Sequence, residues 1–336
     1  MSFTIEKTLA TPQEVIRAHP LSAERAQRIK EHRQEIKNII AGKDKRVLLI
    51  IGPCSAWPDG AVMSYARRLS SISQEVGDKI KIVLRTYTQK PRTTIGWKGP
   101  VFQKNPQGEE DLDEGIAHVR KLFLDLLEFD LPLADEAVFP ELTDYTLDLL
   151  SYVAIGARSA ESMQHRCYAS MISLPVGLKN PTSGSIEIGV NNVIAAQHPH
   201  VFFYRDKQIS SKGNPYAHLV LRGGSGKSNT SKEELELALK LLREKTKNPA
   251  IIVDVSHDNS LRDGKKDPRT QPGSIMRIRE YGIKEIKGFM VESFLKEGKQ
   301  DITTTKDLDL GGISITDACL GWEETQQLIL DLYKQL

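Results

Sequence analysis

The chain has 336 residues, of which 46 are basic and 44 acidic, so its formal net charge is +2. This balance argues against a general nucleic-acid or membrane surface, and no apolar run approaches the about 20 residues that span a bilayer. Cys54, Cys167 and Cys319 are an odd and sparse set that does not suggest a disulfide framework. The first residues lack the basic-then-apolar order of a signal peptide, so we expect a cytoplasmic protein.

A helix is predicted near the N-terminus, between Ser22 as its cap and Gly42 as its stop. Its apolar residues recur at helical spacing: Ala26, Ile29, Ile36, Ile39 and Ile40. The first strong strand follows this helix. We therefore expect residues 1–45 to form an N-terminal extension and residues 46–336 to form one larger domain.

From residue 47 onward, short apolar strands alternate with helical patterns, among them a helix after Ser231 with Glu234 completing a capping box. The predicted strands are Val47–Gly52, Ile80–Arg85, Leu131–Glu136, Val153–Arg158, Ile172–Lys179, His218–Arg222, Ile251–His257 and Phe289–Glu292. Eight such units predict an α/β fold, a (β/α)8 TIM barrel. The extra apolar run "HVFFYR" predicts an inserted hairpin before the sixth strand. A doubly wound open sheet is the alternative, although no GxGxxG follows the first strand.

Polar side chains stand at or just after the end of every predicted strand. They are Cys54, Arg85 with Lys90, Glu136, Arg158, Lys179, Arg222, His257 and Glu292. In a barrel all of these positions face the C-terminal mouth, where barrel active sites are built. A single polar residue at the end of a strand means little, but polar residues at the ends of all eight predicted strands indicate a functional site.

One group in this set suits a metal ion. Cys54, His257 and Glu292, with Asp317 in the segment "SITDACLGW", offer a thiolate, an imidazole and two carboxylates. Such a mixture suits one divalent ion of Mn, Fe, Co or Zn better than Mg or Ca. Taken singly, each residue is more often a packed or hydrogen-bonded structural residue, and only the barrel would bring the four together.

The second group is cationic and consists of Arg85, Lys90, Arg92, Lys98, Arg158, Lys179 and Arg222. Guanidinium groups match phosphate oxygens in bidentate fashion, and a lysine adds a point charge. The set is too large for one phosphate, which predicts two phosphorylated ligands or one that also carries a carboxylate. Surface salt bridging is the alternative for any single member.

The motifs that carry these residues resemble those of the class I 3-deoxy-D-arabino-heptulosonate 7-phosphate (DAHP) synthases. The matching stretches are "IGPCS", "KPRTTIGWKG", "AIGARSAES", "PVGLKN", "LRGG", "DVSHDNS", "MVESFL" and "SITDACLGWEET". The resemblance implies a TIM barrel and metal-dependent condensation of phosphoenolpyruvate with erythrose 4-phosphate, the first step of the shikimate pathway. It also implies a homodimer or homotetramer that uses the N-terminal extension.

Carried over motif by motif, the resemblance assigns roles to the residues of this chain. The metal ligands are Cys54, His257, Glu292 and Asp317; the cations for phosphoenolpyruvate are Arg85, Lys90, Arg158, Lys179 and Arg222; the contacts of erythrose 4-phosphate are Arg92 and Thr93. We add Lys98 and Glu136 to the substrate-binding set, and expect Lys90, His257 and Asp317 to act in catalysis. Lys90 is the candidate for proton transfer at the new hydroxyl, because a lysine among arginines is expected to have a lowered pKa.

Three segments depart from the family pattern. Ala56–Asp59 replaces the usual Ile-His-Asp-Pro, Phe139 and Thr143 replace an Asp and a Pro, and the hairpin segment is short. The last two regions help to form the aromatic amino-acid inhibitor site in regulated members, so we predict altered or absent feedback by phenylalanine, as in a specialised paralogue. The alternatives are a 3-deoxy-octulosonate 8-phosphate synthase, whose loop reads "KANRSS" instead of "KPRTT", and a catalytically silent regulatory paralogue.

Overall fold

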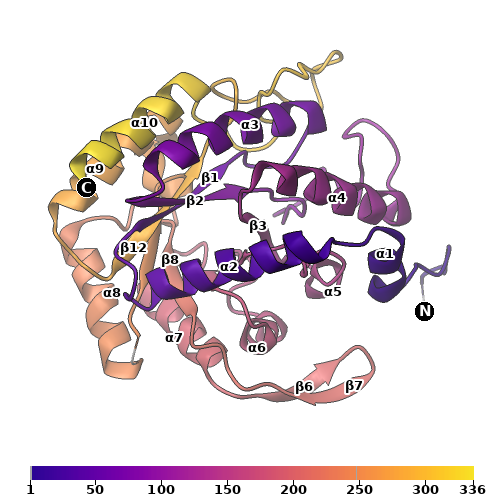
Figure 1. The fold of residues 1–336 in the computed structure, drawn as a ribbon, viewed down its shortest axis with the longest axis horizontal. Coiled ribbons are helices and arrows are strands. Elements are labelled where there is room, and N and C mark those ends of the chain that lie inside the picture. The colour runs from indigo at the N-terminus through magenta and orange to yellow at the C-terminus, as the bar shows by residue number, and fades with distance from the viewer. Residues whose placement is uncertain (1, 247) are drawn as a thin grey trace.

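Eight parallel strands close into a barrel in the computed structural model of this protein, which describes residues 2–246 and 248–336 (Figure 1). Around the barrel the strands are β1 (Val47–Gly52), β12 (Ile286–Glu292), β9 (Ile251–Asp254), β8 (Ala217–Leu221), β5 (Val176–Lys179), β4 (Tyr152–Ile155), β3 (Leu133–Glu136) and β2 (Ile80–Arg85). Closure is made at β1, where Leu49 lies opposite both Phe289 of β12 and Ile82 of β2. The predicted (β/α)8 barrel is confirmed, and the open-sheet alternative is excluded.

A helix follows each barrel strand, as the alternating pattern predicts. The α-helices are α1 (Pro12–Ala18), α2 (Ala23–Ile40), α3 (Asp59–Val76), α4 (Leu112–Leu126), α5 (Pro140–Thr143), α6 (Met163–Met171), α7 (Ile186–Gln197), α8 (Lys232–Lys245), α9 (Gln271–Glu280) and α10 (Trp322–Gln335), with 3-10 turns η1 (Leu127–Phe129), η2 (His257–Ser260) and η3 (Pro268–Thr270). The predicted capping box of α8 is present, because Ser231 accepts from the Glu234 amide and Glu234 accepts from the Ser231 amide. Within the two described ranges, no helix combines the length and the apolar character needed to cross a membrane.

The predicted insertion is an antiparallel hairpin of β6 (Val201–Tyr204) and β7 (Lys207–Ser210), placed between α7 and β8. Its turn uses Arg205 and Asp206, both with positive φ (47° and 58°), which is the geometry of a tight hairpin turn. Figure 1 shows the hairpin beyond α6, away from the barrel strands. A second, very short hairpin pairs β10 (Leu261–Arg262) with β11 (Lys265–Lys266).

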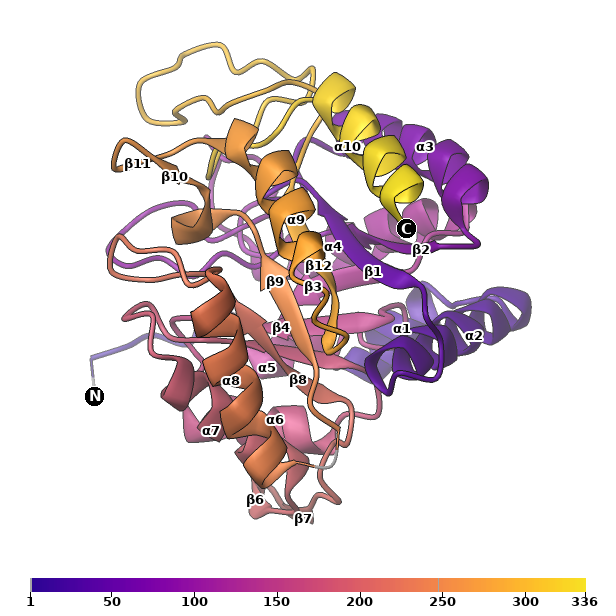
Figure 2. The same cartoon turned by 90° about the vertical axis from the view of Figure 1, so that its left-hand side faces the viewer.

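The N-terminal extension packs against the barrel through α2. Ser22 caps α2 as predicted, because its hydroxyl accepts from the amide of Arg25. Ile36, Ile39 and Ile40 belong to the same buried cluster as the barrel residues Leu48, Ile50, Val83, Tyr152, Ile252 and Met290. Figure 2 shows α2 at the end of the barrel where β1 starts and the β10–β11 hairpin at the opposite end. Helix α2 therefore closes the bottom of the barrel and leaves the mouth open.

Some strand limits differ from the predicted ones for local reasons. Strand β3 starts two residues late, after Pro132, which has no amide proton to give to a sheet. Strand β5 starts four residues late, because Ile172 still caps α6. Strands β4 and β9 both end three residues early, so Arg158 and His257 belong to the loops that follow them.

Candidate active site

One pocket at the C-terminal mouth of the barrel is lined by all but two of the predicted site residues. Its lining is Cys54, Arg85, Lys90, Pro91, Arg92, Glu136, Ala157, Arg158, Lys179, Arg222, His257, Lys266, Glu292, Thr316 and Asp317. These residues come from the C-terminal ends of all eight barrel strands and from the loops that follow them, as the barrel topology requires. The exceptions are Thr93 and Lys98.

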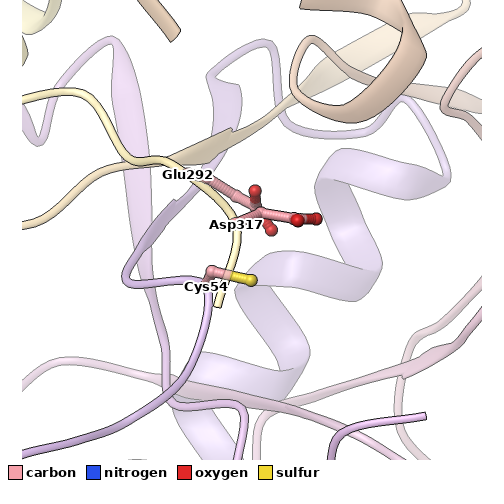
Figure 3. Close-up of side chains that lie close together, drawn as sticks. All are labelled: Cys54, Glu292 and Asp317. Carbon is pink, nitrogen blue, oxygen red and sulfur yellow. The ribbon is translucent and has the colours of Figure 1, made fainter. Parts of the chain in front are cut away.

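A thiol and two carboxylates meet at one side of this pocket (Figure 3). One ligand atom from each of Cys54, Glu292 and Asp317 lies within 4.8 Å of the others. Cys54 follows β1 and Glu292 ends β12, and the register sets Glu292 opposite Gly52. The segment with Asp317 is held beside both strands, because the Leu320 amide donates to the Glu292 carbonyl at 2.9 Å and the Cys54 amide donates to Cys319 Sγ at 3.4 Å.

The fourth predicted ligand, His257, stands beside this group without being part of it. Its Nε2 lies 3.6 Å from Oε1 of Glu292, and its Nδ1 lies 3.0 Å from Oδ2 of Asp254. A carboxylate hydrogen-bonded to the far nitrogen of a histidine is the usual support for a metal ligand. Here Oδ2 of Asp254 is close to Nδ1 of His257, but among the described residues neither atom has a hydrogen-bond partner. Together the four residues offer sulfur, nitrogen and oxygen donors, which fit a divalent transition metal.

The electrostatic surroundings differ between the donor atoms. Burial raises the pKa of the Cys54 thiol, and the carboxylate of Glu292 adds to the effect. Burial alone would also raise the pKa of Asp317, but the charges of His257, Lys266 and Lys90 lower it to about 2. Without a metal ion the site therefore holds an ionised Asp317 and a protonated thiol at neutral pH.

The cations of the pocket are held by buried acids. Arg85 Nη2 lies 3.0 Å from Oε1 of Glu292, and Lys179 Nζ lies 2.9 Å from Oδ2 of Asp254, with all four side chains almost wholly buried. Among the described residues, Nη1 of Arg85 is a buried nitrogen with no hydrogen-bond partner. A buried guanidinium with an open N–H donor is suited to receive an anion from the pocket.

Sequence reasoning missed two residues that organise these cations. Asp254 is fully buried at the end of β9 and pairs with both Lys179 and His257. Although burial opposes ionisation, these two partners hold the pKa of Asp254 well below its usual range. The ring of Tyr87 lies 3.9 Å from the guanidinium carbon of Arg85, measured to the ring centroid, and its face also attracts lysine side chains. The available signal was period-two alternation, which puts Tyr87 on the same face as Arg85.

Lys90 is the one residue whose predicted electrostatics are wrong. Its Nζ donates to the carbonyl of Cys54 at 2.6 Å and lies 3.3 Å from the Cys54 sulfur. Burial favours the neutral amine, but the neighbouring acidic groups of Cys54, Glu136 and Glu292 outweigh it and raise the pKa of Lys90. The prediction of a lowered pKa counted the neighbouring arginines and missed the anions. Lys90 is thus held as an ammonium, a proton donor.

In the "KPRTT" segment, Arg92 lines the pocket and Thr93 does not. Arg92 Nε donates to the carbonyl of Trp97 at 2.7 Å, and Arg158 Nε donates to the Thr93 hydroxyl at 2.9 Å. Lys98 turns away and pairs with Glu110 at 2.6 Å. A role for Lys98 in substrate binding therefore stays a prediction.

A parallel barrel with a metal-type donor group and a cluster of cations at its mouth defines a metal-dependent enzyme class that acts on anionic substrates. The sequence profile of the DAHP synthetase I family matches residues 20–329. The chain belongs to this family.

Relatives and a solved structure agree with that membership. The chain is 38% identical to the Tyr-sensitive phospho-2-dehydro-3-deoxyheptonate aldolase of Escherichia coli K12, over 99% of this chain and 94% of the relative. It is also 38% identical to the Trp-sensitive enzyme of the same strain, over 96% and 93% of the two chains. A solved structure of phospho-2-dehydro-3-deoxyheptonate aldolase from Francisella tularensis SCHU S4 superposes with a TM-score of 0.93 at 34% identity, covering 99% of this chain and 98% of that one.

Proposed function

We propose that this protein is a DAHP synthase, which condenses phosphoenolpyruvate with erythrose 4-phosphate and releases phosphate. The observation that carries the proposal is the single pocket that joins Cys54, Glu292 and Asp317 to a set of convergent cations. Two negatively charged substrates repel each other in water, and such a pocket replaces their encounter with a fixed geometry.

The chain's own cations bind and orient phosphoenolpyruvate. The cations assigned to its phosphate and carboxylate all line the pocket: Arg85, Lys90, Arg158, Lys179 and Arg222. Erythrose 4-phosphate enters from the side of Arg92, which presents its guanidinium at the rim. C3 of phosphoenolpyruvate then attacks the aldehyde carbon, water adds at C2, and the phosphate leaves.

Cys54, His257, Glu292 and Asp317 would hold one divalent ion, of Mn, Fe, Co or Zn. When bound, the ion supplies Lewis acidity that draws electron density from the aldehyde. Lys90 donates a proton at the oxygen that becomes the new hydroxyl, because its raised pKa keeps the ammonium charged at neutral pH.

The test follows the ultraviolet absorbance of phosphoenolpyruvate with erythrose 4-phosphate present, before EDTA, after EDTA, and after Mn²⁺ is restored. Turnover that EDTA abolishes and Mn²⁺ restores is expected. Arabinose 5-phosphate in place of erythrose 4-phosphate tests the octulosonate alternative. A folded, metal-loaded protein that consumes phosphoenolpyruvate with neither aldose phosphate contradicts the proposal and favours the silent paralogue.

We further propose a cytoplasmic homodimer or homotetramer in which residues 1–45 make oligomer contacts. The support is family membership and the exposed apolar side chains of Phe3 and Ile5, which are 67% and 78% exposed. Light scattering of the full chain and of a variant starting at residue 11 measures this directly. Equal masses for the two proteins contradict the assigned contact.

A further inference from the structure

The loop of residues 90–98 carries Lys90, Arg92 and Thr93, and hydrogen bonds outside the pocket hold its base. The Thr88 amide donates to Oδ1 of Asp135 at 2.9 Å, and the Thr88 hydroxyl donates to Oδ2 at 2.5 Å. Oδ1 also accepts from the Glu136 amide at 2.7 Å. Asp135 is 1% exposed. One buried carboxylate thus ties the chain after β2 to the end of β3.

The next residue, Gln89, ties the same stretch to the start of α5. Its Oε1 accepts from the Phe139 amide at 2.8 Å, and its Nε2 donates to the Thr143 hydroxyl at 3.2 Å. Gln89 is 2% exposed, so both bonds are shielded from water. Phe139 and Thr143 are two of the positions at which this chain departs from the family pattern. Thr143 supplies the hydroxyl that Gln89 binds, whereas position 139 supplies a backbone amide, which every residue except proline has.

The two ends of the loop meet just beyond this anchor. The Lys90 amide donates to the Lys98 carbonyl at 2.8 Å. Gly99 has φ +103°, and a Cβ there would come within 2.1 Å of the Thr88 carbonyl oxygen. The first and last residues of the loop therefore lie side by side, in close contact with Thr88. Contacts that fix the positions of Thr88 and Gln89 consequently fix both ends of the loop.

We propose that Asp135, Thr88 and Gln89 are positioning residues that hold the 90–98 loop so that Lys90 and Arg92 face the substrates. None of the three lines the pocket, so they act through the loop and do not touch substrate. Hydrogen bonds that fix Lys90 and Arg92 before substrate arrives reduce the entropy that is lost when the substrate binds. The kinetic part of this inference rests on the proposed function.

Matched variants separate positioning from general damage. Gln89→Leu removes both hydrogen bonds, whereas Gln89→Glu keeps two acceptors, one for the Phe139 amide and one for the hydroxyl of Thr143. Thr88→Val removes the hydroxyl bond to Asp135, and Thr88→Ser keeps it. The control is Ser170→Ala, a buried serine of α6 whose hydroxyl bonds the Cys167 carbonyl and the Ser211 hydroxyl, neither of which is part of the anchor.

The expected result is selective for the second substrate. Gln89→Leu and Thr88→Val should raise the KM for erythrose 4-phosphate by about tenfold and lower kcat, because a small displacement of oriented groups is costly. The KM for phosphoenolpyruvate should change less than about twofold, since four of its five assigned cations stand outside the loop. Gln89→Glu, Thr88→Ser and Ser170→Ala should behave as the unaltered enzyme. Unaltered kinetics in Gln89→Leu and Thr88→Val would overturn the inference, and so would an equal rise in both KM values.

Limited trypsin digestion without substrate gives a readout that does not need activity. If the anchor is released, cleavage after Arg92 and Lys98 should become faster in Gln89→Leu than in Gln89→Glu, with Ser170→Ala unchanged. If the unaltered enzyme shows no turnover, the proposed function fails. The digestion rates alone then test whether Gln89 holds the 90–98 loop. Equal cleavage rates in all variants would then refute it.

Discussion

Metal binding at Cys54 should depend steeply on pH, with affinity rising as the pH rises. The reason is that a metal ion binds the thiolate, while burial raises the pKa of this thiol above its ordinary value of 9.0. Below that pKa, every ion bound must displace the thiol proton. Asp317 adds no such step, because its pKa of about 2 leaves it ionised throughout.

The magnitude follows from this proton count. One proton released per ion gives a tenfold rise in apparent affinity per pH unit, about 1.4 kcal/mol. The window from about pH 7.5 to 8.5 lies below the titration range of the raised thiol. The affinity for Mn²⁺ should thus increase about tenfold across this window.

The assay is a titration of EDTA-stripped enzyme with Mn²⁺, in which the free ion is measured by its electron paramagnetic resonance signal at each pH. A pH indicator in weak buffer counts the released protons, and about one per ion is expected. Cys54→Ser should bind more weakly and lose the slope, whereas Cys167→Ser, in α6, should keep it. Affinity that stays flat across the window, or an equal slope in Cys54→Ser, refutes the reasoning.

Three further outcomes are expected. Lys90→Met should lower turnover by about 10²- to 10⁴-fold in the phosphoenolpyruvate assay, because it removes the proton donor; near-normal turnover would exclude Lys90 from catalysis. Burial raises the pKa of Asp135 from 3.8 to about 7, so in that interval the folded state holds a proton that the unfolded state has lost, and the free energy of unfolding should fall with rising pH by roughly 1.4 kcal/mol per unit. Urea unfolding between about pH 5 and 7 should show that fall diminished in Asp135→Asn, and identical slopes would contradict the assignment. Phenylalanine at millimolar concentration should leave turnover unchanged, because Tyr204 and Arg205 of the hairpin both bind Asp144 beside α5; strong inhibition at low concentration would show this inference to be wrong.

Most of the barrel could be predicted from sequence because its signals are local. A strand such as Val47–Gly52 is one apolar run, and its end is marked by Gly52 and Pro53. Once eight strands close, every strand end faces the same mouth, so the convergence of Cys54 and Glu292 follows from topology alone.

What could not be predicted depends on neighbours in space. The pKa of Lys90 is decided by Cys54, Glu136 and Glu292, which come from three other strands. In the sequence, Asp254 is simply the polar residue that follows three apolar residues of a strand. Its ion pair with Lys179 is visible only in the fold. Charges add across a pocket, and a linear pattern records neither their distances nor their sum.

One departure from the family pattern, Thr143, has a structural meaning beyond the inhibitor region. Its hydroxyl accepts from Gln89, which directly precedes Lys90, while the backbone amide of Phe139 donates to the same side chain. The buried side chain of Gln89 has one acceptor, Oε1, and one donor group, Nε2. The segment packed against it must therefore supply an N–H donor for Oε1 and an acceptor, here a hydroxyl, for Nε2. A proline at position 143 has neither hydroxyl nor amide proton, so it could not fill that role. In this chain the segment after β3 is therefore part of what holds the catalytic loop, and substitutions there should be judged by their effect on Lys90 as well as by their effect on inhibitors.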